Sequence, residues 1–192
     1  MRKNLQYFAS AAALGLVTLG GAAQVAAAPV VLTFSEFPVG TVITNQYAAQ
    51  GVVFSPGING NYPIIADDGA MPTTPVLSPN PPYAGDFDIE FLTSTTWVQF
   101  DSGFWDTIGT GIIDVYDLGG ILIDTVSNSV TGVETFTFSN PLTGIGRIVF
   151  NSSGDPAGAD IGDLSFNVPE PGSLLLLGIG LLGALGLRGK RA

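Results

Sequence analysis

Three carboxylates alternate with three apolar residues in the stretch DFDIEF, residues 86–91. Asp86, Asp88 and Glu90 are spaced two residues apart, so in a β-strand they would share one face while the apolar residues face the core. Two carboxylates at a suitable separation are enough for glycoside hydrolysis, and a row of them can also hold a cation or accept hydrogen bonds from sugar hydroxyls. An ordinary polar outer face is the alternative interpretation.

Two tryptophans are further candidates for contact with a ligand. The apolar residues of TTWVQF alternate with Trp97, which predicts that this indole lies on the outer face of a strand, and Trp105 in SGFWD is expected in a loop. An exposed indole beside amides and carboxylates can stack on a pyranose ring. Packing at a sheet edge or beneath a loop is the alternative for each. The candidate carbohydrate-binding residues are therefore Trp97, Trp105, Asp86, Asp88 and Glu90.

The chain contains no cysteine and no histidine. It therefore cannot form a Ser-His-Asp triad, a thiol nucleophile or a conventional zinc site. This excludes most hydrolase mechanisms and favours a protein that is not an enzyme. A hydrolase that uses Asp and Glu alone is the enzymatic alternative that the composition leaves open.

The charges are unevenly distributed along the chain. Residues 28–168 hold 15 of the 16 acidic residues but only one of the six basic residues, Arg147, which gives this part a net charge of −14. Such a surface repels nucleic acid and attracts divalent cations or cationic partners. We expect Arg147 to pair with a carboxylate, because it is surrounded by acids.

Short runs with a period of two, broken by turn residues, dominate the middle of the chain. They predict strands over residues 30–37, 51–55, 62–66, 87–92, 95–101, 112–117, 121–126, 133–138, 145–151 and 161–167. No stretch has a convincing helical period. The sequence therefore predicts an all-β domain with an antiparallel β-sandwich. The proline-rich segment 72–83, PTTPVLSPNPPY, is expected to be a surface loop.

The first 27 residues have the pattern of a secretory signal peptide. Arg2 and Lys3 precede an apolar stretch, which is followed by small residues. Val25 and Ala27 suit the −3 and −1 positions, so we expect cleavage after Ala27. Export by the general secretion machinery and processing by signal peptidase follow from this prediction.

An uncharged apolar run near the other end extends from Gly172 to Leu187. As a helix it would be about 24 Å long, slightly shorter than the ~30 Å hydrocarbon core of a bilayer. This predicts a short transmembrane helix. The basic residues Arg188, Lys190 and Arg191 would act as a stop-transfer signal on the cytoplasmic side. A permanent anchor is one interpretation of this pattern.

Directly before this run stand Val168, Pro169, Glu170 and Pro171, which should form an extended, exposed segment. Together with the Leu/Gly-rich run and the basic tail, residues 168–192 resemble the PEP-CTERM sorting segment of Gram-negative bacteria. The resemblance implies recognition by an exosortase, a membrane transpeptidase, with cleavage at or near Pro-Glu-Pro. It also implies an inner-membrane intermediate and a final place at the cell surface or in an exopolysaccharide biofilm matrix.

The domain between the two ends, residues 28–167, resembles jelly-roll, galactose-binding-like domains. The resemblance rests on FSEFPVGTVITNQYAAQGVVF near its start and GADIGDLSF at its end. It implies a jelly-roll-like sandwich with a structural calcium ion where the first and last strands meet. By position, Glu36 and Asp163 would bind the ion, with Asp160 as a third ligand. Carboxylates suit Ca²⁺, a hard cation, but solvated turn residues are the alternative.

The resulting hypothesis is a non-catalytic extracellular protein, processed by an exosortase and associated with exopolysaccharide at the cell surface. Its calcium-supported β-sandwich would bind carbohydrate, and contact with the membrane would be transient. Two alternatives stay open at this point. One is a polysaccharide hydrolase with paired carboxylates, and the other is a structural matrix protein without a ligand.

Overall fold

The computed structural model describes residues 29–58 and 60–168. The predicted signal peptide, the Pro169-Glu170-Pro171 cleavage motif, the transmembrane helix and the basic residues after it lie outside these residues. No helix within the described ranges is long and apolar enough to cross a membrane. The part described consists of eleven β-strands and one 3₁₀ helix, η1. Their bounds are β1 Pro29–Leu32, η1 Ala48–Gln50, β2 Val52–Pro56, β3 Ile64–Ala66, β4 Val76–Ser78, β5 Asp86–Thr95, β6 Trp97–Trp105, β7 Ile112–Tyr116, β8 Leu122–Ser127, β9 Gly132–Ser139, β10 Ile145–Asn151 and β11 Asp160–Asn167.

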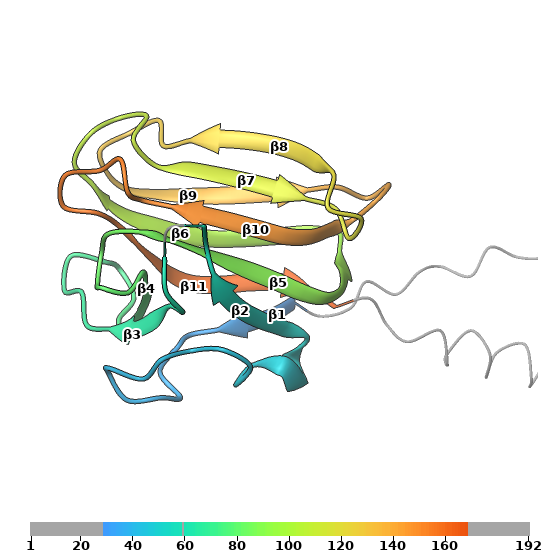
Figure 1. Ribbon diagram of the computed structural model, residues 1–192, viewed down its shortest axis with the longest axis horizontal. Coiled ribbons are helices and arrows are strands. Elements are labelled where there is room, and N and C mark those ends of the chain that lie inside the picture. The colour runs from blue at the N-terminus through green and yellow to red at the C-terminus, as the bar shows by residue number, and fades with distance from the viewer. Residues whose placement is uncertain (1–28, 59, 169–192) are drawn as a thin grey trace, which may run out of the picture.

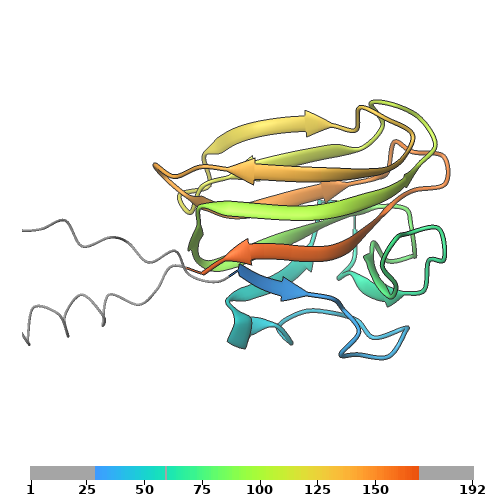
Figure 2. The ribbon, with the colours of Figure 1, turned by 180° about the vertical axis from the view of Figure 1, so that it is seen from behind.

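The strands form two antiparallel sheets that pack face to face, seen from opposite sides in Figures 1 and 2. Sheet A has the order β3-β4-β11-β6-β9, with β1 also paired to β11, and sheet B has the order β2-β5-β10-β7-β8. From β5 onward the chain crosses repeatedly between the sheets, so neighbours in sequence often lie in different layers. The predicted all-β antiparallel sandwich is confirmed.

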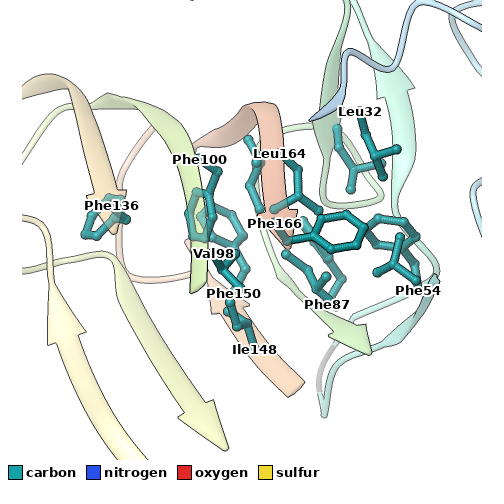
Figure 3. Close-up of a cluster of buried hydrophobic side chains, with 14 of the residues drawn as sticks. Leu32, Phe54, Phe87, Val98, Phe100, Phe136, Ile148, Phe150, Leu164 and Phe166 are labelled. Carbon is teal, nitrogen blue, oxygen red and sulfur yellow. The ribbon is translucent and has the colours of Figure 1, made fainter. Parts of the chain in front are cut away.

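Aromatic and branched aliphatic side chains fill the space between the two sheets (Figure 3). The phenylalanines of sheet B meet those of sheet A and of their own sheet, as in the pair Phe91–Phe166, with ring centroids 5.1 Å apart, and the pair Phe87–Phe150, at 5.2 Å. As expected from the alternation in DFDIEF, Phe87, Ile89 and Phe91 all face this core. Their burial removes apolar surface from water and fixes the opposite, polar side chains of the same strands on the outside.

Two expectations about the secondary structure were wrong. The first strand ends at Leu32 and not at residue 37, because Phe34 has a φ of 59° and turns the chain out of the extended conformation. The proline-rich segment contains strand β4, Val76–Ser78, which pairs with both β3 and β11. A strand of three residues between prolines is too short to show a period of two.

A second, smaller cluster of apolar side chains lies apart from the main core. Ala66, Met71 and Val76 are buried in it, with Tyr83 and Val133 packed against them. On β4, Leu77 belongs to the main core, so its neighbour Val76 points to the outer face of sheet A. The segment 67–74, which joins β3 to β4, therefore covers part of this outer face.

Candidate carbohydrate-binding site

A hollow of about 160 Å³ lies on the outer face of sheet B, over β5, β10 and β7. Strand β10 runs between the other two, and Val149 at its middle pairs with Asp88 of β5 on one side and Asp114 of β7 on the other. The register therefore brings together residues that are distant in sequence. The lining of this sheet B hollow consists of Ile58, Asp86, Asp88, Ile112, Asp114, Tyr116, Arg147, Val149 and Asn151.

Arg147 organises the charges in the sheet B hollow. Its Nη1 donates a hydrogen bond to Asp88 Oδ2 at 3.0 Å, which makes the ion pair expected from the sequence. The guanidinium also lies over the Tyr116 ring, with Cζ 4.3 Å from the ring centroid. Because one planar cation contacts both a carboxylate and an aromatic face, it holds both side chains in a fixed orientation.

Asp88 is acted on by charges of both signs. Burial raises its pKa, the Arg147 charge and hydrogen bond lower it, and the negative charges of Glu90 and Asp86 raise it. The net effect is an increase. The Asp88 carboxyl group therefore takes up a proton at a higher pH than an exposed aspartate does.

The neighbouring acidic side chains are also held in place. Glu90 Oε1 accepts a hydrogen bond from the Ser55 hydroxyl of β2. Asp114 Oδ1 accepts one from Thr125 Oγ1 of β8 at 2.6 Å. These strands lie at the edges of sheet B, so the side chains of five strands fix the polar groups in and beside the hollow.

A glycine-containing loop closes one end of the hollow. Asp86 is only 3% exposed, because the backbone at Gly57 and Gly60 lies directly on it. A Cβ atom at Gly60 would lie 1.9 Å from the Asp86 carbonyl oxygen, and one at Gly57 would lie 2.5 Å from the Asp86 carboxyl carbon. Only glycine permits such close backbone approach.

Strand β5 places Asp86, Asp88 and Glu90 on its outer face, as the alternation indicated. Trp97 lies elsewhere, because its neighbour Val98 points into the core from β6 of sheet A. Trp97 therefore lies, partly exposed, on the outer face of the opposite sheet. The predicted set of carbohydrate-binding residues is thus divided between the two faces of the sandwich.

The expected position of Trp105 was wrong. It is the last residue of β6 and is fully buried in the main core, with its ring centroid 5.9 Å from that of Phe150. A Cβ atom at Gly111 would lie 2.3 Å from this indole, so the absence of a side chain there makes room for it. A fully buried ring cannot stack on a sugar, because no ligand can reach its face.

Sequence reasoning gave no binding role to Tyr116, Asp114 and Asn151, which also line the hollow. The alternation of IIDVY and of IGRIVFN would have placed their side chains on outer faces. What it could not show is that β10 lies between β5 and β7. That adjacency turns three separate outer faces into one site.

The residues predicted to bind calcium lie in two places. Burial raises the pKa of Asp163, the Thr73 hydroxyl lowers it, and the charges of Asp101 and Glu36 raise it, so Glu36 and Asp163 are within electrostatic range of each other. The Glu36 carboxylate also accepts a hydrogen bond from the Tyr47 hydroxyl at 2.9 Å.

The side chains that shift the pKa of Asp160 are instead Ser78 and Asp68. In the part of the chain that the structure describes, no three acidic side chains gather as a metal-binding group. The three predicted ligands are therefore not brought together, and calcium binding itself stays a prediction.

No curated protein matches the sequence. Among solved structures, two family 29 carbohydrate-binding modules are each 14% identical to this chain. For one variant of the module, the match covers 60% of this chain and 91% of the module, with a TM-score of 0.34. For another variant, it covers 75% of this chain and 100% of the module, with a TM-score of 0.35. A cleaved adhesin domain of Lys-gingipain is 12% identical, with 73% and 100% covered and a TM-score of 0.41. Similarity at this level carries no information about the ligand.

One comparison identifies a segment of the chain. Residues 167–191 match the family model of the PEP-CTERM protein-sorting motif, in agreement with the resemblance of residues 168–192. Asn167, where the match begins, is also the last residue of β11 and pairs with Pro29, the first residue of β1. The chain therefore carries a PEP-CTERM protein-sorting motif that begins where its β-sandwich ends.

Proposed function

We propose that this protein is exported, processed by an exosortase, and binds carbohydrate at the cell surface through the sheet B hollow. The sorting motif supports the route, because such a motif implies exosortase processing of an exported protein. The binding role rests on one observation: an aromatic ring and several polar side chains line the same hollow on sheet B. They are Tyr116, Arg147, Asp88, Asp114 and Asn151. Concave sites with an aromatic ring and a few fixed polar groups are typical of small-ligand binding.

The chemistry of the lining favours a neutral sugar. Carboxylates at Asp88 and Asp114 can accept hydrogen bonds from sugar hydroxyls, and Arg147 can donate to ring or hydroxyl oxygens. Val149 lies between them on the floor of the hollow, and Ile112 adds apolar contact beside Asn151. An anionic polysaccharide is disfavoured, because residues 28–168 carry a net charge of −14.

We also propose a jelly-roll-like topology, a structural calcium ion and a final location in a biofilm matrix. The repeated crossing between sheets supports a jelly-roll-like topology, and the proximity of Glu36 to Asp163 supports a structural calcium ion where β11 meets the segment after β1. A biofilm matrix as the final location is supported by the sorting motif alone.

The test is retention of the full-length chain, purified in mild detergent, on exopolysaccharide from the producing organism, together with an assay for reducing ends. We expect retention without release of reducing ends. Release that disappears in Asp88→Asn would establish the hydrolase alternative. A folded protein that is not retained would establish the structural alternative and contradict a binding role.

A further inference from the structure

Asp160 is a buried carboxylate with no hydrogen-bonding partner. It begins β11, its side chain is 0% exposed, and neither Oδ1 nor Oδ2 forms a hydrogen bond within the described residues. Its backbone is well held, since Ser102 Oγ donates to the Asp160 carbonyl at 2.8 Å. Buried polar groups in proteins are nearly always satisfied, and an ionised carboxylate without a partner is costly.

The side chain points away from the main core. Its neighbour Ile161 is a core residue that pairs with Leu77, so Asp160 lies on the outer face of sheet A, across from Ser78. Ser78 is also fully buried, and its Oγ accepts a hydrogen bond from the Tyr83 N–H at 2.8 Å. The segment 67–74 covers this part of the sheet.

A second carboxylate comes from that covering segment. The pKa of Asp160 is raised to about 8: burial raises it most, the Ser78 hydroxyl lowers it, and the nearby Asp68 carboxylate raises it. The turn that carries Asp68 is ordered, because Asp68 Oδ1 accepts the Ala70 N–H at 2.9 Å and the Asp68 carbonyl accepts the Met71 N–H at 3.2 Å.

Tyr83 lies beside the same acids. Its hydroxyl donates to the Asp67 carbonyl at 3.3 Å. Burial raises the pKa of Tyr83, and the charges of Asp160, Asp68 and Asp67 raise it further. The negative charge around this point is therefore shared by several groups on β11 and the covering segment.

No side chain in the described residues can neutralise this charge. Residues 28–168 contain a single basic residue, Arg147, which lies on the outer face of the opposite sheet and pairs with Asp88. The compensation must therefore come from outside the described residues. A proton and a metal cation are the two candidates.

We propose that Asp160 and Asp68 bind a divalent cation, Ca²⁺, between the outer face of sheet A and the covering segment 67–74, with Ser78 Oγ as a further oxygen ligand. Ca²⁺ binds about 6–8 oxygen atoms from carboxylates, carbonyls and water, and it tolerates irregular geometry. The site would connect the covering segment to sheet A. Neither Glu36 nor Asp163 is among the groups that shift the pKa of Asp160, so the proposed ligand set differs from that pair. The site lies on the other sheet from the sheet B hollow, so it does not depend on the proposed carbohydrate binding.

Calcium titration of the full-length chain in detergent, after treatment with a chelator at constant neutral pH, tests this site. Calorimetry gives binding, and a thermal melt gives the change in unfolding midpoint. We expect CaCl₂ to bind and to raise the midpoint of the wild-type chain, because a cation that binds only the folded state stabilises it. Terbium emission sensitised by Tyr83, and lost in Tyr83→Phe, would locate the ion at this site.

The variants distinguish this site from other acidic sites. Asp160→Asn and Asp68→Asn should each abolish the calcium-dependent increase in midpoint, whereas Asp124→Asn, an exposed acid on β8, should keep it. Asp68→Asn is the safer variant for folding, because Asp68 is only partly buried.

Three outcomes would overturn the proposal. A calcium effect that survives in both Asp160→Asn and Asp68→Asn would place the ion elsewhere. An effect lost only in Glu36→Gln would assign it to the Glu36–Asp163 pair. If the wild-type chain binds no calcium and Asp160→Asn melts higher than wild type, a proton and not a metal ion neutralises Asp160.

Discussion

Arg147 and Asp88 form an ion pair, with 3.0 Å between Nη1 and Oδ2, in the middle of the outer face of sheet B. The side chain of Asp88 is 10% exposed and that of Arg147 is 38% exposed, so the carboxylate is the more deeply buried partner. Asp86 and Glu90 on the same strand add negative charge around it. The single cation of the domain therefore lies beside the row of three acids on β5.

Arg147→Gln should destabilise the domain, because it leaves Asp88 buried among like charges. We expect a decrease of about 1 kcal/mol in the free energy of unfolding, since the arginine is partly exposed and solvent screens the pair. Arg147→Lys restores the charge without the planar contact to Tyr116 and should recover only part of the loss. Denaturant unfolding measures both variants, and a Gln variant as stable as wild type would contradict this role.

Gly111→Ala should destabilise the core by about 1–3 kcal/mol, because the added methyl group overlaps the buried Trp105 ring. Gly69→Ala is the matched control, since nothing lies within 4 Å of its added Cβ. Unfolding followed by tryptophan fluorescence compares the two variants. Equal stability of the two variants would mean that Trp105 is not packed against residue 111.

Asn167→Ala should weaken the end of β11 by about 1–3 kcal/mol. Asn167 Oδ1 accepts the N–H groups of Thr96 at 2.9 Å and of Trp97 at 3.1 Å, and its Nδ2 donates to Thr96 Oγ1 at 2.7 Å. Asn167→Asp keeps the acceptor but not the donor, so it should retain more stability than the alanine variant. Hydrogen exchange at Thr96 and Trp97 measures the effect, and unchanged protection in Asn167→Ala would contradict it.

The raised pKa of Asp88 predicts a pH effect of defined sign. The folded domain binds the Asp88 proton more tightly than the unfolded chain does, so the free energy of unfolding decreases as pH rises from the ordinary pKa of 3.8 towards the raised value. In Asp88→Asn this contribution is absent, and stability should depend less on pH in that interval. Parallel unfolding curves at several pH values test this, and equal slopes for the two proteins would contradict the shift.

Much of the fold could be predicted because the alternation is strong. The run DFDIEF fixed which side chains of β5 face inward, and the same period located β7 and β10. Strand β4 could not be found, because three residues between prolines show no period. Trp105 was misplaced because nothing in SGFWD reveals that Gly111, six residues later, leaves space for the ring.

The site could be predicted only in part, because it depends on which strands become neighbours. Local spacing indicated that Asp86, Asp88 and Glu90 share a face. It did not indicate that β10 separates β5 from β7, or that Trp97 belongs to the other sheet. For the same reason the sequence did not indicate Asp68 as a cation ligand, since only the folded covering segment brings it close to Asp160.

The most direct test of carbohydrate binding through the sheet B hollow compares variants on the two outer faces of the sandwich. Retention of each variant on exopolysaccharide is measured in one experiment. Tyr116→Ala removes the aromatic ring that lines the hollow, and Val149→Arg places a long side chain in the hollow without changing the core. Trp97→Ala changes the outer face of the opposite sheet. We expect the wild-type chain and Trp97→Ala to be retained equally, and both hollow variants to lose retention while remaining folded. Retention that survives in both hollow variants, or is lost only in Trp97→Ala, would contradict binding at this site.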